Sequence, residues 1–499
     1  MAASTLVPHM SYAADWQVTP KVQLRETYTD NVRLAPRGRE ESDFVTEIEP
    51  GVAITGVGPR LQMQLDYAFK YRLYAKNSDA NGHNHALRAN GLLDVWDRKL
   101  FLQGSAAIAQ QNISTLGPQS TSDININPNR TEVRQGTLSP YWISRLGRFA
   151  NVNARYTWNR MESDGETSAL SSESNTVNLG LSQGSMFNEL GWSVSYSRQD
   201  IDSTQGQFNK RTLETLTASA SYALLPTLSG LLSIGREDNA YGDTQGSIGG
   251  NFYSVGFQWA PSRRTNIRAE VGERYFGNTF SLDAQHRTRL TAWTLTYGEQ
   301  VVGTPGLLSV PVSLDTAATV DRLFISQVPD PIQRQQVVQA FIAQNGLPQF
   351  LPSSVDFLTN QVSLSKRWQG TFGLRGIRSA LLLSLFRDDR QRESSGTPTI
   401  VGTDPFSLSD NVLQTGYNAI LSWRFSERTS GSVSVGQIKS EMTDASRTDT
   451  NSNIRIGITH QLQPKLRGSV EYRWLNRDTN SSAGDVRENA ITGTLSLAF

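Results

Sequence analysis

Ten charged side chains could bind an ion, because their segments alternate charged or polar residues with apolar ones. In "VEYRW", Glu471 and Arg473 alternate with Val470, Tyr472 and Trp474. Such alternation places the charges on one face of a strand and the apolar side chains on the other. Guanidinium groups match carboxylates and phosphates, so this face favours an anionic molecule; alternatively, the charges pair with one another and stiffen the fold. The candidates for this inward, lumen-lining face are Lys70, Arg72, Arg155, Arg268, Glu270, Arg289, Arg367, Arg455, Glu471 and Arg473.

Residues for catalysis or metal binding are sparse. The chain has five His and no Cys. His83 and His85 form a His-x-His pair in "NGHNHAL", but a structural zinc site needs about four ligands, so we predict a solvated loop there. No Walker sequence, G-x-S-x-G or HExxH is present. A His–Ser pair of the kind found on the exterior of some outer-membrane enzymes has no positive support at His286 or His460. We therefore predict no enzyme activity, no metal and no cofactor.

The elements that position the ten charges are extended strands. In residues 60–74, Leu, Met, Tyr and Phe occupy one face while Gln, Asp, Lys and Arg occupy the other. The last nine residues, "ITGTLSLAF", repeat the pattern and end on Phe499. Apolar residues facing lipid and polar residues facing a lumen are typical of a transmembrane β-barrel. No run approaches the roughly 18 apolar residues of a membrane helix, and the net charge of +1 gives no reason to expect nucleic acid.

The connections alternate between short turns and longer polar loops. We predict an all-β, antiparallel transmembrane barrel of about 22 strands, with a range of about 20–24, whose short turns are periplasmic. The strand count depends on residues 279–300, which form either one long strand or a hairpin that turns near 286–288. The hairpin is preferred, because it gives an even number and places the insertion 301–354 at the rim of the long loops. Trp residues near strand ends favour the lipid headgroup level.

The insertion 301–354 carries the one helical signature. Asp330 is a suitable N-cap, Pro331 suits the first turn and Gly346 suits the end. The apolar residues 332, 337, 338, 341 and 342 would form a stripe. We predict a loop with a short helix that either packs externally on its neighbours or folds into the lumen as a constriction.

The remainder of the chain is assigned to one barrel, residues 15–499. Residues 1–14 end in "SYAA", which is typical of a signal-peptidase site, and we interpret them as a truncated signal-peptide remnant or a tail. A transporter of the TonB-dependent class is disfavoured, because that class carries a plug domain before the barrel and the first strand is expected near Trp16.

Three segments resemble one family of outer-membrane barrels. "KVQLRETYTDNVRLAP" (21–36), "DFVTEIEPGVAI" (43–54) and "ERYFGNTFSLDAQHRTRLTAWTLTYGEQ" (273–300) are similar to the barrels associated with PEP-CTERM and exosortase gene systems, as is the C-terminal strand. The resemblance implies a Gram-negative outer-membrane protein that takes part in exopolysaccharide export, with periplasmic export proteins as partners. It implies no catalytic residues.

These observations lead to three hypotheses. The first is a conduit for an exopolysaccharide, possibly anionic; the second is a porin for general or small solutes; the third is a structural or adhesion protein. The long loops discriminate between the first two, because loops inside the lumen would set a solute cutoff and loops outside would leave room for a polymer chain.

Overall fold

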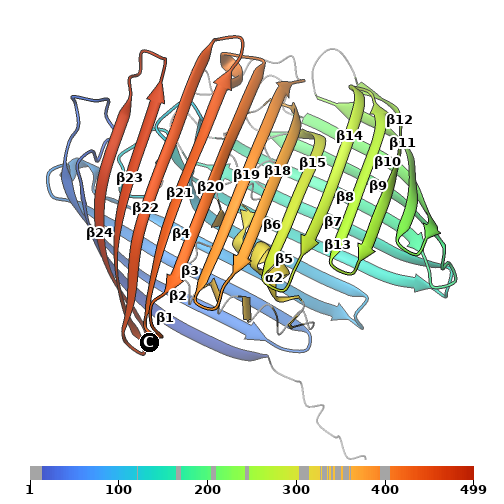
Figure 1. Cartoon of the computed structure of the whole chain (residues 1–499), viewed down its shortest axis with the longest axis horizontal. Coiled ribbons are helices and arrows are strands. Elements are labelled where there is room, and N and C mark those ends of the chain that lie inside the picture. The colour runs from blue at the N-terminus through green and yellow to red at the C-terminus, as the bar shows by residue number, and fades with distance from the viewer. Residues whose placement is uncertain are drawn as a thin grey trace, which may run out of the picture.

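The computed structural model describes residues 14–120, 122–164, 170–203, 210–241, 247–302, 314–325, 327–328, 334, 337–338, 341–342, 350–351, 359, 361–393 and 405–499. Its main feature is one antiparallel sheet of 22 strands that closes on itself, because β1 pairs with both β2 and β24 (Figure 1). The predicted all-β barrel is therefore confirmed. The hairpin in residues 279–300 is also confirmed, because β14 ends at Arg287 and β15 begins at Thr291.

The strands are long enough to cross the hydrocarbon core when tilted. They are β1 Asp15–Thr29, β2 Asp43–Val57, β3 Leu61–Tyr74, β4 Gly82–Trp96, β5 Leu100–Asn112, β6 Arg130–Leu146, β7 Ala150–Ser163, β8 Leu170–Gln183, β9 Leu190–Ser203, β10 Lys210–Leu225, β11 Leu228–Ala240, β12 Ser247–Ser262, β13 Thr265–Arg274, β14 Gly277–Arg287, β15 Thr291–Val302, β18 Ser363–Arg375, β19 Ser379–Arg392, β20 Asn411–Arg424, β21 Thr429–Met442, β22 Arg447–Gln463, β23 Leu466–Thr479 and β24 Val486–Ala498. Smaller elements are η1 Ser78–Ala80, η2 Pro405–Ser407, α2 Thr316–Phe324 and a two-strand ladder of β16 Leu314–Asp315 with β17 Phe350–Leu351. No helix in the described residues is long and apolar enough to cross a bilayer.

The two rims of the barrel differ in the length of their connections. The short-turn rim joins β2 to β3, β4 to β5 and so on to β22 and β23, with two to six residues in each turn. The long-loop rim carries the other connections, including 30–42, 113–129 and the segment between β15 and β18. Two connections on this rim are short, because Tyr275 and Phe276 alone join β13 to β14 and the four residues 443–446 join β21 to β22.

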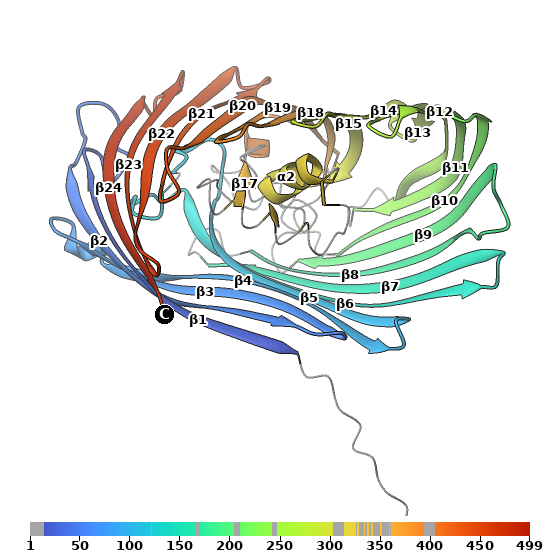
Figure 2. The ribbon, with the colours of Figure 1, turned by 60° about the horizontal axis from the view of Figure 1, so that its bottom comes forward.

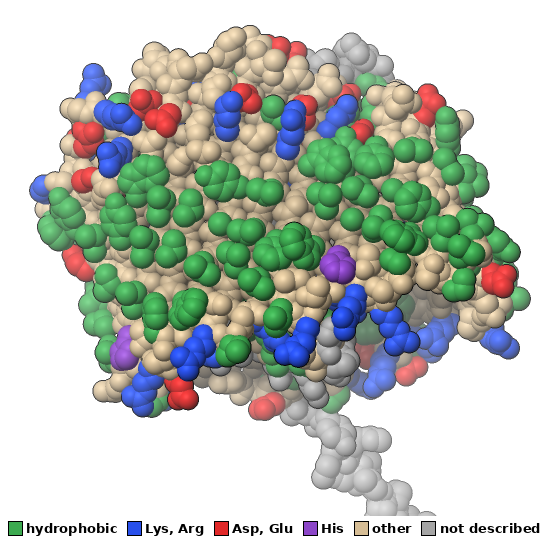
Figure 3. Space-filling model, in the orientation of Figure 1, with side chains coloured by type: hydrophobic (Ala, Val, Ile, Leu, Met, Phe, Trp, Pro, Cys, Tyr) green, Lys and Arg blue, Asp and Glu red, His purple; other side chains and the backbone are tan. Residues whose placement is uncertain are grey.

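The outer face is an apolar belt. On β12, Tyr253, Val255, Phe257 and Trp259 point outward and each is more than 40% exposed. Figure 3 shows such side chains as a band across the molecule, with charged side chains gathered above and below it. The C-terminal strand follows the same rule, because Ile491 and Leu495 are exposed while Thr492 meets Thr27 across the seam at 3.0 Å between hydroxyl oxygens.

The long insertion enters the barrel instead of packing outside it. Figure 2 shows α2 inside the ring of strands. Its Val320, Leu323 and Phe324 are buried against Ala380 and Leu382 of β19. Of the two alternatives predicted for this insertion, its described part therefore follows folding into the lumen and not packing outside. The physical reason is that the inner wall offers an apolar surface, to which Ala292 of β15 and Ile420 of β20 also contribute.

The predicted helical stripe contributes to the same cluster. Of the predicted helix, the described residues Arg334, Val337, Val338, Phe341 and Ile342 are helical. Val338 and Ile342 are buried in the cluster, and Val337 and Phe341 pack against it. The proposed cap Asp330, the Pro at 331, residue 332 and the Gly at 346 lie outside the described residues, as do residues 1–13 of the proposed leader.

Candidate functional site: the barrel lumen

The inner wall of the barrel has three regions of different chemistry. An ion-pair sector covers β22–β24 and β1–β3. An apolar sector, covered by α2, lies on β15 and β18–β20 near the short-turn rim. A neutral sector on β6–β9 presents mainly Ser, Asn and Gly inward. The ten predicted residues are distributed among these regions and near them, so they do not form one basic ring.

The ion-pair sector contains five of the predicted residues. Arg473 donates to Glu488 at 2.9 Å, and both side chains are almost fully buried. Arg455 lies 3.8 Å from Glu471. Neighbouring pairs repeat the arrangement: Arg25 pairs with the buried Glu47 of β2, and Arg477 pairs with the buried Asp449 of β22. These charges neutralise one another, which agrees with the alternative of a stiffening network.

Loop 113–129 crosses the lumen as a strap and is held by this sector. Lys70 donates to Asp123 at 2.7 Å, Arg130 donates to the same carboxylate at 2.8 Å, and Arg72 donates to the Asp123 carbonyl. Burial alone would raise the pKa of Asp123, but the Lys70 ammonium and the Arg130 guanidinium lower it by more. The resulting pKa of Asp123 lies well below its usual range.

The strap reaches strands far from its own. Arg447 of β22 and Arg477 of β23 both donate to the carbonyl of Leu116, at 2.7 and 2.9 Å. Asn125 donates to Glu488 of β24 at 2.7 Å. The strap therefore links β5 and β6 to the opposite side of the seam and obstructs part of the cross-section near the long-loop rim.

Three other predicted residues also face the lumen. Arg268 of β13 pairs with Glu270 at 2.7 Å and keeps 46% of its side chain exposed. Arg367 of β18 lies 3.8 Å from Asp388, which is itself bonded to the buried Arg390. These two sites differ in accessibility, because the insertion side of the lumen buries Arg367 and its neighbours while Arg268 stays open to solvent.

Arg155 of β7 lies within the neutral sector, in a different setting. Its guanidinium stacks over the ring of Tyr141 at 4.2 Å and donates to Gln103 at 3.0 Å. Tyr141 in turn stacks on Phe101 with ring centroids 5.0 Å apart. No carboxylate contacts Arg155 among the described residues, so its charge is available to a passing solute.

Two positional predictions are wrong. Arg289 lies in the short turn between β14 and β15 and not on a lumen-facing strand. His83 and His85 lie on β4 and not in a solvated loop. Their rings pack around Phe69 on the outer face, with centroids 5.4 and 5.5 Å from that ring, and Tyr67 shares a hydrogen bond with His85 at 2.9 Å. The alternation of "GHNHAL" continues the strand, but because His is polar the sequence predicted a loop at these positions.

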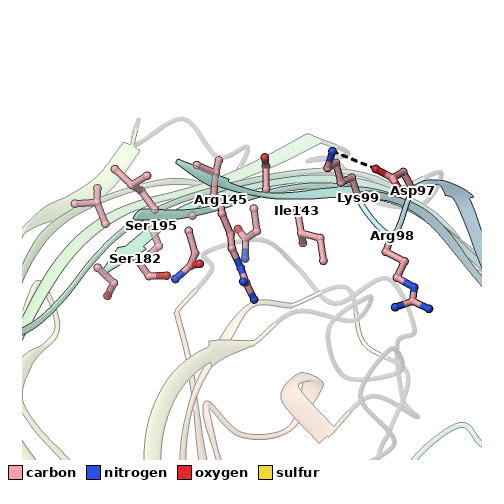
Figure 4. Close-up of a pocket in the computed structure, with 15 residues that line it drawn as sticks. Asp97, Arg98, Lys99, Ile143, Arg145, Ser182 and Ser195 are labelled. Carbon is pink, nitrogen blue, oxygen red and sulfur yellow. Dashed lines mark ion pairs between the residues drawn. The ribbon is translucent and has the colours of Figure 1, made fainter. Parts of the chain in front are cut away.

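A pocket of about 880 Å³ opens on the neutral sector near the short-turn rim. Figure 4 shows Arg145 and Arg98 extending to the same side of the sheet there. Ile143 and Arg145 are exposed on the inward side of the pocket wall, and the other inward residues there are small and polar. They are Asn151, Asn153, Gly180, Ser182, Ser193 and Ser195.

Sequence reasoning missed Arg145, Asp123 and the Asp388–Arg390 pair. Trp142 and Leu146 lie on one face of β6 and Arg145 lies on the other, which is the alternation of a strand. The sequence "SRLGRF" at 144–149 predicts a short turn, and this prediction placed Arg145 outside the strand. Asp123 lies in a loop, where no periodicity indicates a neighbour. In the described residues, no group of three or more acidic and His side chains is placed to hold a metal ion.

Comparisons with known proteins agree with the architecture. A family model described as "Putative beta-barrel porin 2" matches residues 11–139, the part that begins the barrel. The FrpB iron transporter from Neisseria meningitidis shares 10% identity with a TM-score of 0.50, over 96% of this chain and 82% of that chain. The ferric-catecholate import receptor Fiu from E. coli K12 shares 7% identity with a TM-score of 0.51, over 97% and 82%. No curated protein matches.

At such low identity these structures show the fold alone. Together with the apolar belt and the polar lumen, this fold defines the chain as an outer-membrane β-barrel. The short-turn rim is accordingly the periplasmic rim.

The strap yields a prediction for Asp123→Asn. Removing the carboxylate leaves Lys70 and Arg130 partly buried without their shared counter-charge, so we expect the strap to lose on the order of 3 kcal/mol of docking energy. Limited proteolysis at neutral pH should then cleave within 113–129. The control is Asp97→Asn, which removes an exposed pair with Lys99 and should leave cleavage unchanged.

The wild-type strap should also resist acid. Because the folded-state pKa of Asp123 is lowered, its stabilisation is complete above the unfolded pKa and is lost only as pH falls toward the folded value. We expect protection from an acid-active protease to persist down to about pH 4. Cleavage that begins already near neutral pH would contradict the Asp123 anchor.

Proposed function

We propose that this protein is a passive, constricted diffusion channel for small hydrated solutes, with a preference for anions, and that it acts without catalysis or a cofactor. The observation that carries the proposal is the position of the insertion. Buried contacts from Val320 and Leu323 to Leu382 hold α2 on the inner wall, within the cross-section that a solute must pass. Segments inside the lumen set a size cutoff, which is the arrangement expected of a porin and not of an open polymer conduit.

The solute path that fits this arrangement follows the neutral sector. Ser and Asn side chains exchange hydrogen bonds with water readily, so a hydrated solute meets a mainly polar surface. Arg145 and Arg155 lie in this sector with exposed or partly exposed guanidinium groups, and Arg268 of β13 faces the lumen beside Glu270 with 46% of its side chain exposed. Fixed positive charge in a narrow aqueous pore raises the local concentration of anions.

The ion-pair sector supports the proposal in a structural role. Arg473, Arg477 and Glu488 are nearly inaccessible and bonded to protein groups, so they cannot exchange ligands with a permeant. They stiffen the wall beside the seam and anchor the strap. The selectivity of the channel is therefore assigned to the few arginines outside this sector.

Excising the insertion tests the constriction directly. Val302 and Ser363 are register partners, so residues 303–362 can be replaced by a short Gly-Asn turn without changing strand pairing. We expect single-channel conductance in planar bilayers to rise several-fold. A matched control shortens loop 443–446, which joins β21 to β22 at the same rim, and should leave conductance unchanged. Equal conductance after excision would contradict a constricting role.

Charge substitution tests the anion preference. The triple variant Arg145→Gln, Arg155→Gln and Arg268→Gln should lower the anion-to-cation permeability ratio by at least about twofold, measured from reversal potentials in a salt gradient. Arg387→Gln is the matched control, because Arg387 pairs in register with the outward Trp368 and is exposed on the outer face. If the triple variant and the control behave alike, these arginines do not select the solute.

Export of an exopolysaccharide, with periplasmic partners of the export system, is the second candidate function. It is favoured by the neutral sector and the stacked Phe101–Tyr141 pair, because aromatic faces and small polar side chains suit a sugar chain. A strain that lacks the protein should then retain polymer in the periplasm, and complementation should restore it to the medium. Normal secretion is the result expected from the porin proposal, and periplasmic retention would overturn it.

A further inference from the structure

The outer wall carries an apolar recess at the seam of the barrel. We name it the seam groove and define it by seven residues and its volume of about 600 Å³. It runs over β22, β23, β24 and β1 on the face that meets lipid. The residues are Leu24, Ile458, His460, Gly468, Val470, Gly493 and Leu495.

Missing side chains create the groove. An added Cβ at Gly493 would meet no heavy atom within 4 Å, so this glycine opens space between its neighbours. Val470 and Leu495 flank it and are 60% and 49% exposed. A depression bordered by branched apolar side chains on a lipid-facing wall has the shape and chemistry that an acyl chain fills.

A hydrogen-bond relay ends at the groove. Ser426 donates to Thr429 at 3.1 Å between hydroxyl oxygens, and the Thr429 hydroxyl lies 2.9 Å from Nδ1 of His460. The contact with Thr429 occupies Nδ1 whichever of the two groups donates, so Nε2 is the ring nitrogen left for another partner. His460 therefore presents Nε2 at the periplasmic end of an apolar groove.

Arg428 lies in the turn that adjoins His460. It precedes Thr429, and its carbonyl accepts from the amide of Gln461, the residue after His460, at 2.8 Å. Its side chain is exposed and, among the described residues, forms no ion pair, although Glu427 shares its turn. A guanidinium and an imidazole at one turn match the oxygens of a phosphodiester.

The same relay occurs at a second periplasmic turn. Ser262 donates to Thr265 at 3.3 Å, and Thr265 lies 2.9 Å from Nδ1 of His286. Both turns follow the pattern W-x-x-S-x-R-T, in residues 259–265 and 423–429. Each places a Trp at the start, an Arg before the Thr and a His on the paired strand. The recurrence of this arrangement at the headgroup level indicates a function at the membrane interface. The relay at His460 differs from the relay at His286 because His460 lines the seam groove.

We propose that the seam groove binds an anionic phospholipid of the periplasmic leaflet, with its phosphate at Arg428 and His460 and one acyl chain over Gly493. Glu26 lies directly opposite Gly493 in the register of β1 with β24, and its carboxylate accepts from Thr46 at 2.7 Å. Its carboxylate disfavours a phosphate there, which fixes the orientation of the lipid. This inference is independent of the solute that the lumen carries.

The test is lipid retention by the purified barrel. Protein in detergent is titrated with dioleoyl phosphatidylglycerol, and bound lipid is counted by native mass spectrometry. The wild type should retain one lipid that Arg428→Gln with His460→Ala binds about tenfold more weakly, the loss expected from one charge-assisted hydrogen bond. Gly493→Leu, which fills the groove, should lose the same lipid.

Two controls keep the test decisive. Gly136→Leu makes the same change at another lipid-facing glycine whose added Cβ meets no atom within 4 Å, and it should retain the lipid. Dioleoyl phosphatidylcholine should be retained at least about tenfold less than phosphatidylglycerol by the wild type. If the Arg428 and His460 variant retains phosphatidylglycerol like the wild type, or both lipids bind alike, the proposal fails. The basic turn would then fit an acidic periplasmic protein better. Because Arg428 and His460 lie at the rim, that variant remains informative if Gly493→Leu fails to assemble.

Discussion

The structure depends on satisfying backbone hydrogen bonds inside the hydrocarbon core of the bilayer, where no water is available. Within lipid, every N–H and C=O that does not find a protein partner costs several kcal/mol, so a sheet that spans the bilayer has to close. Here β1 pairs with β24 from Lys21–Ala498 to Thr29–Ala490, and the amide of Phe499 adds a bond to the carbonyl of Pro20. Closure fixes which side chains face lipid, and thereby which face of every strand is left to line the lumen.

The shape of the lumen depends on two segments that dock on the inner wall where its chemistry matches their own. The insertion between β15 and β18 packs where the wall is apolar, at Ala380 and Leu382. The strap docks where the wall supplies guanidinium and ammonium groups for its Asp123 carboxylate and its carbonyls. In the described part of the chain, neither the strap nor α2 docks on the remaining surface, which is the neutral sector. The proposed solute path is therefore the part of the inner wall that these two segments leave uncovered.

The outer wall follows the same logic with lipid in place of loops. Glycines open the apolar belt at the seam groove, and a Ser–Thr–His relay lies at the periplasmic end of the strands in two turns. Thr429 and Thr265 hold the two histidines in matching positions, although the turns are more than 150 residues apart in the chain. The hydrogen bonds within each turn fix the Arg that precedes the Thr, because the amides of Arg428 and Arg264 both donate to the turn serine.

Local periodicity determined the barrel, because the two-residue repeat of a strand is written directly in the order of residues such as Tyr472, Arg473 and Trp474. It also determined the hairpin after Arg287, the even strand number, the rim of the insertion and the helical stripe at Val338 and Ile342. Tertiary structure alone decided the partners. Whether Arg473 meets a solute or Glu488 depends on the register of β23 with β24, and Asp123 meets Lys70 only after a loop crosses the lumen. The location of the insertion was decided in the same way. The run "SALLLSLF" at 379–386 is apolar on both faces of β19, which indicates burial on both sides, but only closure of the barrel shows that the second side is covered by α2.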